Sequence, residues 1–93
     1  MNKVKNFARM LGATRLAKRA QRIGNVLYFQ CVVCLFIVYD HEQAMPASIV
    51  YDIDRGKVVA VEDINGNHID ELRNPRTLEK FVFDDHRERY VRR

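Results

Sequence analysis

The sequence predicts an α+β protein with one transmembrane helix: a basic N-terminal helix, the membrane span, then a small β-hairpin and a C-terminal helix. Two observations lead to this prediction. The 93-residue chain holds 16 Lys and Arg against 12 Asp and Glu, yet every acid lies at or beyond Asp40. Residues 23–39 form an apolar run without charge. The predicted organisation is a basic amphipathic tail over 1–22, a transmembrane helix over 23–39 and an extramembrane α+β segment over 40–93.

The uncharged run is long enough to cross a bilayer as a helix. Seventeen helical residues span about 26 Å, near the lower limit for the hydrocarbon core. Seven Lys and Arg precede the run, and Asp40 and Glu42 follow it. This positive-inside pattern places the N-terminus in the cytoplasm and the C-terminus in the periplasm or outside the cell, across an inner membrane. A cleaved signal peptide fits less well, because the basic region is too long and no small-residue cleavage motif follows Tyr39.

A buried strand is the alternative structure for the same run. Residues 26–39 are rich in β-branched and aromatic side chains, which favour strands. Such a strand would need about fourteen residues, which is longer than most strands in globular proteins. In that case the chain would be a soluble, basic α+β protein that binds nucleic acid.

The basic tail shows helical periodicity. Val4, Phe7, Ala8 and Leu11 fall on one helical face, and Gly12 predicts a hinge. A basic amphipathic helix next to a span is expected to lie on anionic headgroups, where each cation contributes about 1 kcal/mol. Clustered cations also suit the phosphates of nucleic acid. The residues predicted to contact either surface are Lys5, Arg9, Arg15, Lys18, Arg19 and Arg22.

Turn signals divide the C-terminal segment. A polar connector over 41–48 precedes a predicted hairpin, and Asn-Gly-Asn predicts a further turn. Asn74 and Pro75 are typical of a helix start, as cap and first helical residue, and predict a helix that continues to the C-terminus. The predicted elements are strand 48–54, a turn at 55–56, strand 57–64, a turn at 65–67, a short strand or helix start at 68–72, and helix 75–93.

No constellation of residues predicts catalysis. Cys31 and Cys34 have the spacing of a redox pair or half a zinc site, but their apolar surroundings favour ordinary packing. Asp52 and Asp54 echo part of a calcium loop that lacks its later Glu. We expect a protein without catalytic residues, cofactor or metal.

The layout resembles a known family, the inner-membrane assembly factors of type IV secretion and conjugation systems. The resemblance covers a basic tail, one span, a linker with Pro, a strand, a Gly turn, a Val-rich strand and an Arg-rich helix. It implies a bitopic protein whose periplasmic part, one hairpin and one helix of a larger curved sheet, makes protein contacts without enzymatic activity. The residues that carry it are Pro46, Ile49–Ile53, Asp54, Gly56, Val58–Val61 and the segment Leu78–Arg89 with Phe81, Arg87 and Tyr90.

The function predicted from these features is a single-pass scaffold or assembly component of a secretion or conjugation apparatus. Its expected partners are a bilayer with anionic headgroups and proteins bound through residues 40–93, in a homo- or hetero-oligomer. Two alternatives remain: the soluble nucleic-acid-binding protein, and a small phage or plasmid membrane component.

Overall fold

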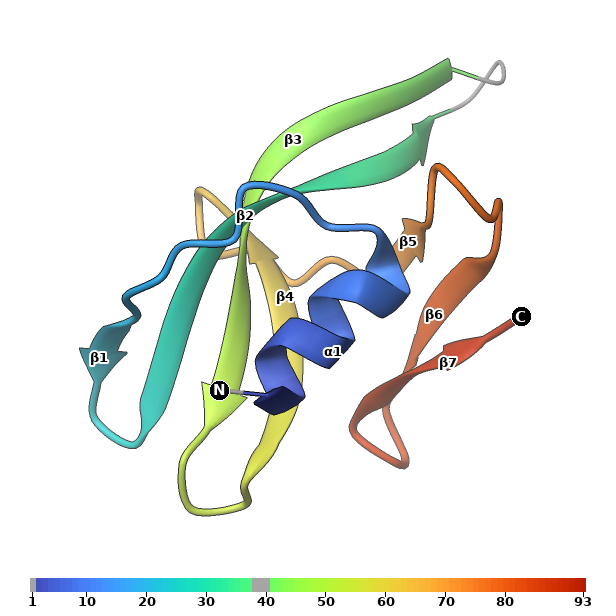
Figure 1. Ribbon diagram of the computed structural model, residues 1–93. Helices are drawn as coiled ribbons and strands as arrows, with labels where there is room; N and C mark the ends of the chain where they lie inside the picture. Colours follow the sequence, from blue (N-terminus) through green and yellow to red (C-terminus); the bar gives the residue numbers. More distant parts are fainter. Residues whose placement is uncertain (1, 38–40) are drawn as a thin grey trace.

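The computed structural model describes residues 2–37 and 41–93. In this part of the chain one helix precedes two antiparallel sheets, with strand orders β1-β2-β3-β4 and β5-β6-β7 (Figure 1). The elements are α1 (Asn2–Leu11), β1 (Gln21–Ile23), β2 (Val26–Ile37), β3 (His41–Asp52), β4 (Lys57–Asp63), β5 (Glu71–Arg73), β6 (Lys80–Asp84) and β7 (Arg89–Arg92). The predicted fold class is therefore wrong in its two main elements, the transmembrane helix and the C-terminal helix.

The segment predicted to be a transmembrane helix forms the end of β1, a tight turn and the strand β2. β1 ends at Ile23, Gly24 adopts a positive φ of 60°, and β2 pairs with β3 along its whole length. Pairing with the neighbouring strands supplies hydrogen bonds for the backbone N–H and C=O groups of the apolar run. The β-branched and aromatic side chains of the run also favour a sheet. No helix within the described residues is long and apolar enough to cross a bilayer. The predicted inner-membrane location rested on this span and is corrected with it; residues 38–40 lie outside the described part.

The N-terminal helix is shorter than predicted. Gly12, with φ of 70°, ends it: the Gly12 amide donates to the Arg9 carbonyl at 3.1 Å and the Ala13 amide to the Ala8 carbonyl at 2.8 Å. These two bonds form a Schellman motif, which stops the helix where the tail was predicted to hinge. The predicted apolar face is confirmed, since Val4, Ala8 and Leu11 are buried. Residues 12–20 then run beside β2 instead of continuing the helix.

The predicted hairpin is confirmed and extended. β3 and β4 cover most of the two predicted strands but end at Asp52 and Asp63, and Gly56 turns between them with φ of 65°. The connector over 41–48, predicted as irregular, belongs to β3. Pro46 lies opposite Val32 of β2, whose amide and carbonyl both bond to Thr14 on the other side of β2. Val32 and Pro46 therefore form a pair without hydrogen bonds, and the nitrogen of Pro46 faces away from β2. β4 pairs with β3 only from Ala47, so the proline interrupts no described ladder.

The predicted C-terminal helix is a turn followed by a β-hairpin. Asn74 does cap: its Oδ1 accepts from the amides of Arg76 at 2.9 Å and Thr77 at 3.3 Å. The chain makes one turn and leaves through Leu78, whose φ is 63°. Phe81 is fully buried in β6, and its packing in the core outweighs the local helix signal.

One core joins α1 and both sheets. Side chains from α1 and from β5–β7 belong to the same cluster as Phe29, Ile49 and Val61 of the first sheet. Tyr90 of β7 connects the two sheets, because its hydroxyl accepts a hydrogen bond from the Val61 amide of β4 at 3.0 Å. The same hydroxyl donates to the Ile69 carbonyl at 2.5 Å. The core therefore covers one face of the four-stranded sheet.

Candidate functional site

Six exposed cations line one edge of the four-stranded sheet and the adjoining helix. The segment after α1 is held beside β2 by reciprocal backbone bonds between Thr14 and Val32, both 2.8 Å, and by the Ala17 amide, which donates to Gln30 at 2.7 Å. The segment therefore carries its charges along the β2 edge, where β1 continues the pairing. We call this set the basic edge: Lys5 and Arg9 of α1, Arg15, Lys18 and Arg19 of the connecting segment, and Arg22 of β1.

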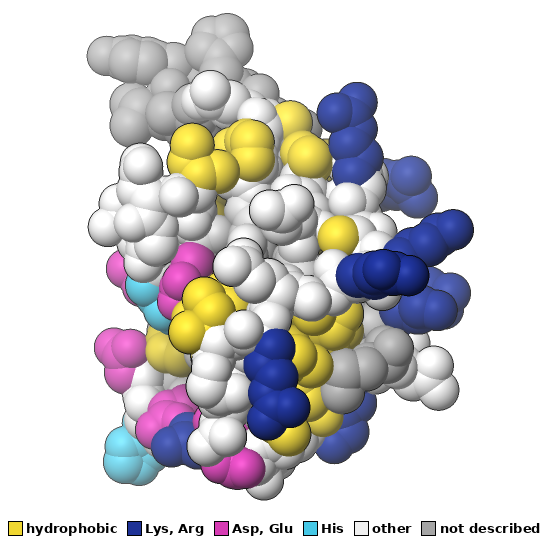
Figure 2. Space-filling view, turned by 90° about the vertical axis from the view of Figure 1, so that its left-hand side faces the viewer, with side chains coloured by type: hydrophobic (Ala, Val, Ile, Leu, Met, Phe, Trp, Pro, Cys, Tyr) yellow, Lys and Arg dark blue, Asp and Glu magenta, His cyan; other side chains and the backbone are white. Residues whose placement is uncertain are grey.

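The basic edge is not neutralised within the described residues. The ion pairs found there join side chains between Asp52 and Arg92, so the acidic half of the chain pairs with its own cations. The seventh N-terminal cation, Lys3, serves the fold, since its Nζ donates to the Gly56 carbonyl at 2.6 Å. Figure 2 shows Lys and Arg gathered along one side of the molecule, with most acids and His toward the other. The charge division of the sequence is thus a division in space.

Cationic side chains from different segments of the chain line the same small cavities. Lys5 and Lys18 line a small groove of about 80 Å³ between α1 and the connecting segment. Arg9 lines a cavity of about 250 Å³ together with Arg76, from the turn before β6. Arg76 was not among the predicted contact residues, because its approach to Arg9 arises from packing of segments more than 60 residues apart. Anions that enter either hollow meet two positive charges.

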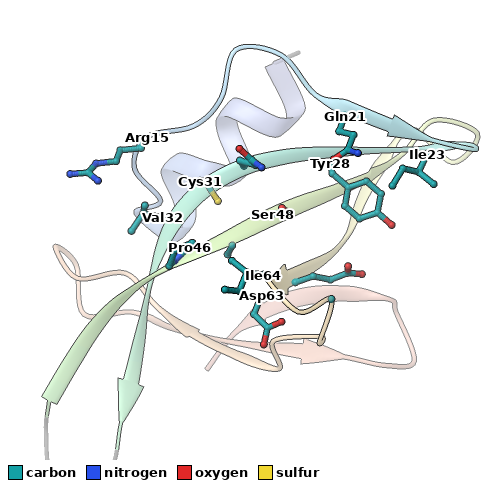
Figure 3. A pocket seen from close by; sticks show the side chains of 14 residues that line it. Arg15, Gln21, Ile23, Tyr28, Cys31, Val32, Pro46, Ser48, Asp63 and Ile64 are labelled. Carbon is teal, nitrogen blue, oxygen red and sulfur yellow. The ribbon is translucent and has the colours of Figure 1, made fainter.

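A larger cavity, of about 480 Å³, lies on the sheet beside the basic edge (Figure 3). Arg15 stands at one end and Tyr28 projects from β2 at the other, with Ser48 between them. Gln30 of β2 also lines the cavity. Tyr28 and Gln30, two positions apart in the apolar run, are the sequence signal for a second face of the sheet, since alternate strand residues point in opposite directions.

The two cysteines occupy opposite faces of β2. Residues three apart in a strand point to opposite sides, so Cys31 and Cys34 do not form a dithiol site. Burial raises the pKa of the Cys31 thiol to about 11, which disfavours the reactive thiolate.

The acidic residues support turns. The Asp63 carboxylate accepts from the amides of Asn65 and Asn67, both at 2.9 Å, and these bonds lower its pKa. Asp52 accepts from the Arg55 amide at 3.0 Å in the hairpin turn. No group of three or more metal-ligating side chains gathers in the described part of the chain. Comparison with protein-family models, curated proteins and solved structures finds no match to this chain.

Proposed function

We propose that this protein binds nucleic acid through the basic edge. The observation that carries the proposal is the placement of six exposed cations, free of ion pairs within the described residues, along one edge of the molecule. Clustered Lys and Arg bind the phosphate backbone and release its condensed counterions, which supplies sequence-independent affinity. The sequence pI of about 9.3 means that the whole protein is positively charged at neutral pH, so it also attracts nucleic acid at long range.

The packing of α1 favours nucleic acid over a lipid surface as the partner. An amphipathic helix binds a bilayer by inserting its apolar face among the acyl chains. In this protein Val4 and Leu11 are each 1% exposed and Ala8 is 4% exposed, so that face is occupied by the core. The cations remain available for phosphates without the apolar contribution that holds such a helix on a membrane.

The test is binding of labelled 20-nucleotide single strands and 20-base-pair duplexes, followed by fluorescence anisotropy as salt is raised. If all six cations contact phosphates, the logarithm of the association constant falls with the logarithm of salt with a slope of roughly −4 for a single strand and −5 for a duplex. Reversing four charges, by Arg15→Glu, Lys18→Glu, Arg19→Glu and Arg22→Glu, should weaken binding at least 100-fold.

A matched control reverses the same number of charges elsewhere, at Arg87, Arg89, Arg92 and Arg93. Both variants have the same net charge, so a difference between them reports position alone. Circular dichroism confirms that each variant is folded. Equal weakening in the two variants, or binding to anionic phospholipid vesicles without binding to either nucleic acid, would contradict the proposal.

A further inference from the structure

We infer that the second face of the four-stranded sheet binds single-stranded nucleic acid, with an unpaired base stacked on Tyr28. This inference rests on the proposed function and narrows it to a substrate class. It starts from the strand register, which sorts β2, β3 and β4 into two faces. Phe29, Ile49 and Val61 face the core with α1 and the second sheet. On the alternate positions, Tyr28, Gln30, Ser48 and Glu62 line the cavity of about 480 Å³.

A polar row crosses this second face. Gln30 of β2 pairs with Ser48 of β3, and Ser48 pairs with Glu62 of β4, so the three side chains lie next to one another on adjacent strands. All three line the cavity. The row offers an amide, a hydroxyl and a carboxylate, which together accept and donate hydrogen bonds. Such a set matches the edge of a nucleobase, whose amino groups donate and whose ring nitrogens and carbonyls accept.

An aromatic side chain stands one row away. Tyr28 pairs with Val50, and Val50 with Ala60, so the Tyr28 row lies two residues along the strands from the polar row, roughly 7 Å. Ile23 and Ile64, which are 55% and 76% exposed, add apolar walls to the same cavity. A flat heteroaromatic ring that stacks on Tyr28 can therefore direct its polar edge toward the polar row. The cavity volume, about 480 Å³, falls within the range of small-molecule binding pockets.

The charges around the cavity orient the bound single-stranded nucleic acid. Arg15 lines the cavity on the side of the basic edge, while Glu62 and Asp63 line the part that β4 contributes. Phosphates are attracted to the first side and repelled from the second, so the backbone follows the basic edge and the bases point across the sheet. Only unpaired bases can stack on a protein side chain in this way, because a duplex keeps its bases stacked on each other.

The experiment compares Tyr28→Ala with Tyr28→Phe against a 12-nucleotide single strand and a 12-base-pair duplex. Loss of one stacked base should weaken single-strand binding roughly 10- to 100-fold in Tyr28→Ala, while Tyr28→Phe keeps the ring and the affinity. Duplex binding, which uses phosphates alone, should be unchanged in both. A second variant, Ser48→Phe, fills the cavity and should weaken single-strand binding by a similar factor while Tyr28 and the basic edge are intact.

The outcomes separate the two proposals. If Tyr28→Ala and Ser48→Phe bind the single strand as the unmodified protein does, while reversal of the basic edge abolishes binding, the base site is wrong and the proposed function stands. If neither nucleic acid binds at low salt, both fail. If sedimentation shows a dimer that Tyr28→Ala and Ser48→Phe dissociate, a second copy covers the face and the base site is wrong.

Discussion

Gly12→Ala is the substitution whose cost the structure defines most sharply. Gly12 has φ of 70°, and a left-handed conformation costs an L-residue about 1–2 kcal/mol. A Cβ added there would lie 2.7 Å from Asn74 Oδ1 and 2.8 Å from Pro75 Cδ. Asn74 cannot retreat freely, because its Nδ2 donates to the Met10 carbonyl at 3.0 Å while Oδ1 accepts two backbone amides. Overpacking of this kind adds about 1–3 kcal/mol, so we expect a total loss of about 2–5 kcal/mol.

Gly24→Ala is the matched control. Gly24 also has a positive φ, of 60°, but nothing lies within 4 Å of its added Cβ. It should lose only the conformational part, about 1–2 kcal/mol. Urea and thermal unfolding followed by circular dichroism measure both. Since about 1 kcal/mol shifts the midpoint of a domain this size by 4–8 °C, Gly12→Ala should melt at least about 4 °C below Gly24→Ala. Equal losses would refute the reasoning that the contact between Gly12 and the Asn74 turn is tight.

Three further perturbations test the core and the turns. Tyr90→Phe leaves a buried amide and a buried carbonyl without their partner and should lower the free energy of unfolding by about 1–3 kcal/mol, measured in urea; an unchanged midpoint would show that the hydroxyl does not join the layers. In a Cys34→Ser variant, Cys31, with its pKa raised to about 11, should react with a thiol reagent at pH 8 only after denaturant is added, and fast labelling of the folded protein would contradict its burial. Backbone amides lower the pKa of Asp63 and Asp84, so their stabilising contribution is complete above the ordinary Asp pKa of about 3.9 and is lost as pH falls through the lowered folded-state values. The double change of both residues to Ala should therefore flatten the acid side of the stability profile, and an unaltered acid transition would count against this account.

Part of the fold is legible from local signals. The apolar face of the helix over 2–11 follows from the spacing of Val4, Ala8 and Leu11, although Gly12 was predicted as a hinge and not as the helix end. The β3–β4 hairpin follows from partial alternation around a turn at Arg55 and Gly56. The turn at 65–67 follows from Asn-Gly-Asn, where Asp63 accepts the amides of both Asn65 and Asn67. Each of these features depends on residues that lie close to one another in the sequence, at most 16 positions apart in the hairpin. Local chemistry is sufficient to predict such elements.

The two wrong elements depended on residues outside the segments themselves. An uncharged apolar run satisfies its backbone either as a helix in lipid or as a strand between two others, and the run over 26–37 has its second partner in β3 and its first in the chain that precedes it. Asn74 caps a turn by local bonds, but whether a helix continues from it was decided by the buried sites that Phe81 and Tyr90 fill. Neither decision is visible in the residues of the segment itself.

The candidate site divides in the same way. The sequence by itself determined that residues 1–39 carry seven cations and no acid, since charge is a property of composition. Only the tertiary structure decided that six of them share an edge, that Arg76 joins Arg9, and that Tyr28 stands one row from Gln30, Ser48 and Glu62. The physical reason is that the charge of a segment depends only on which residues it contains. A binding surface instead requires side chains from several segments to lie close together, which strand pairing and a shared core bring about.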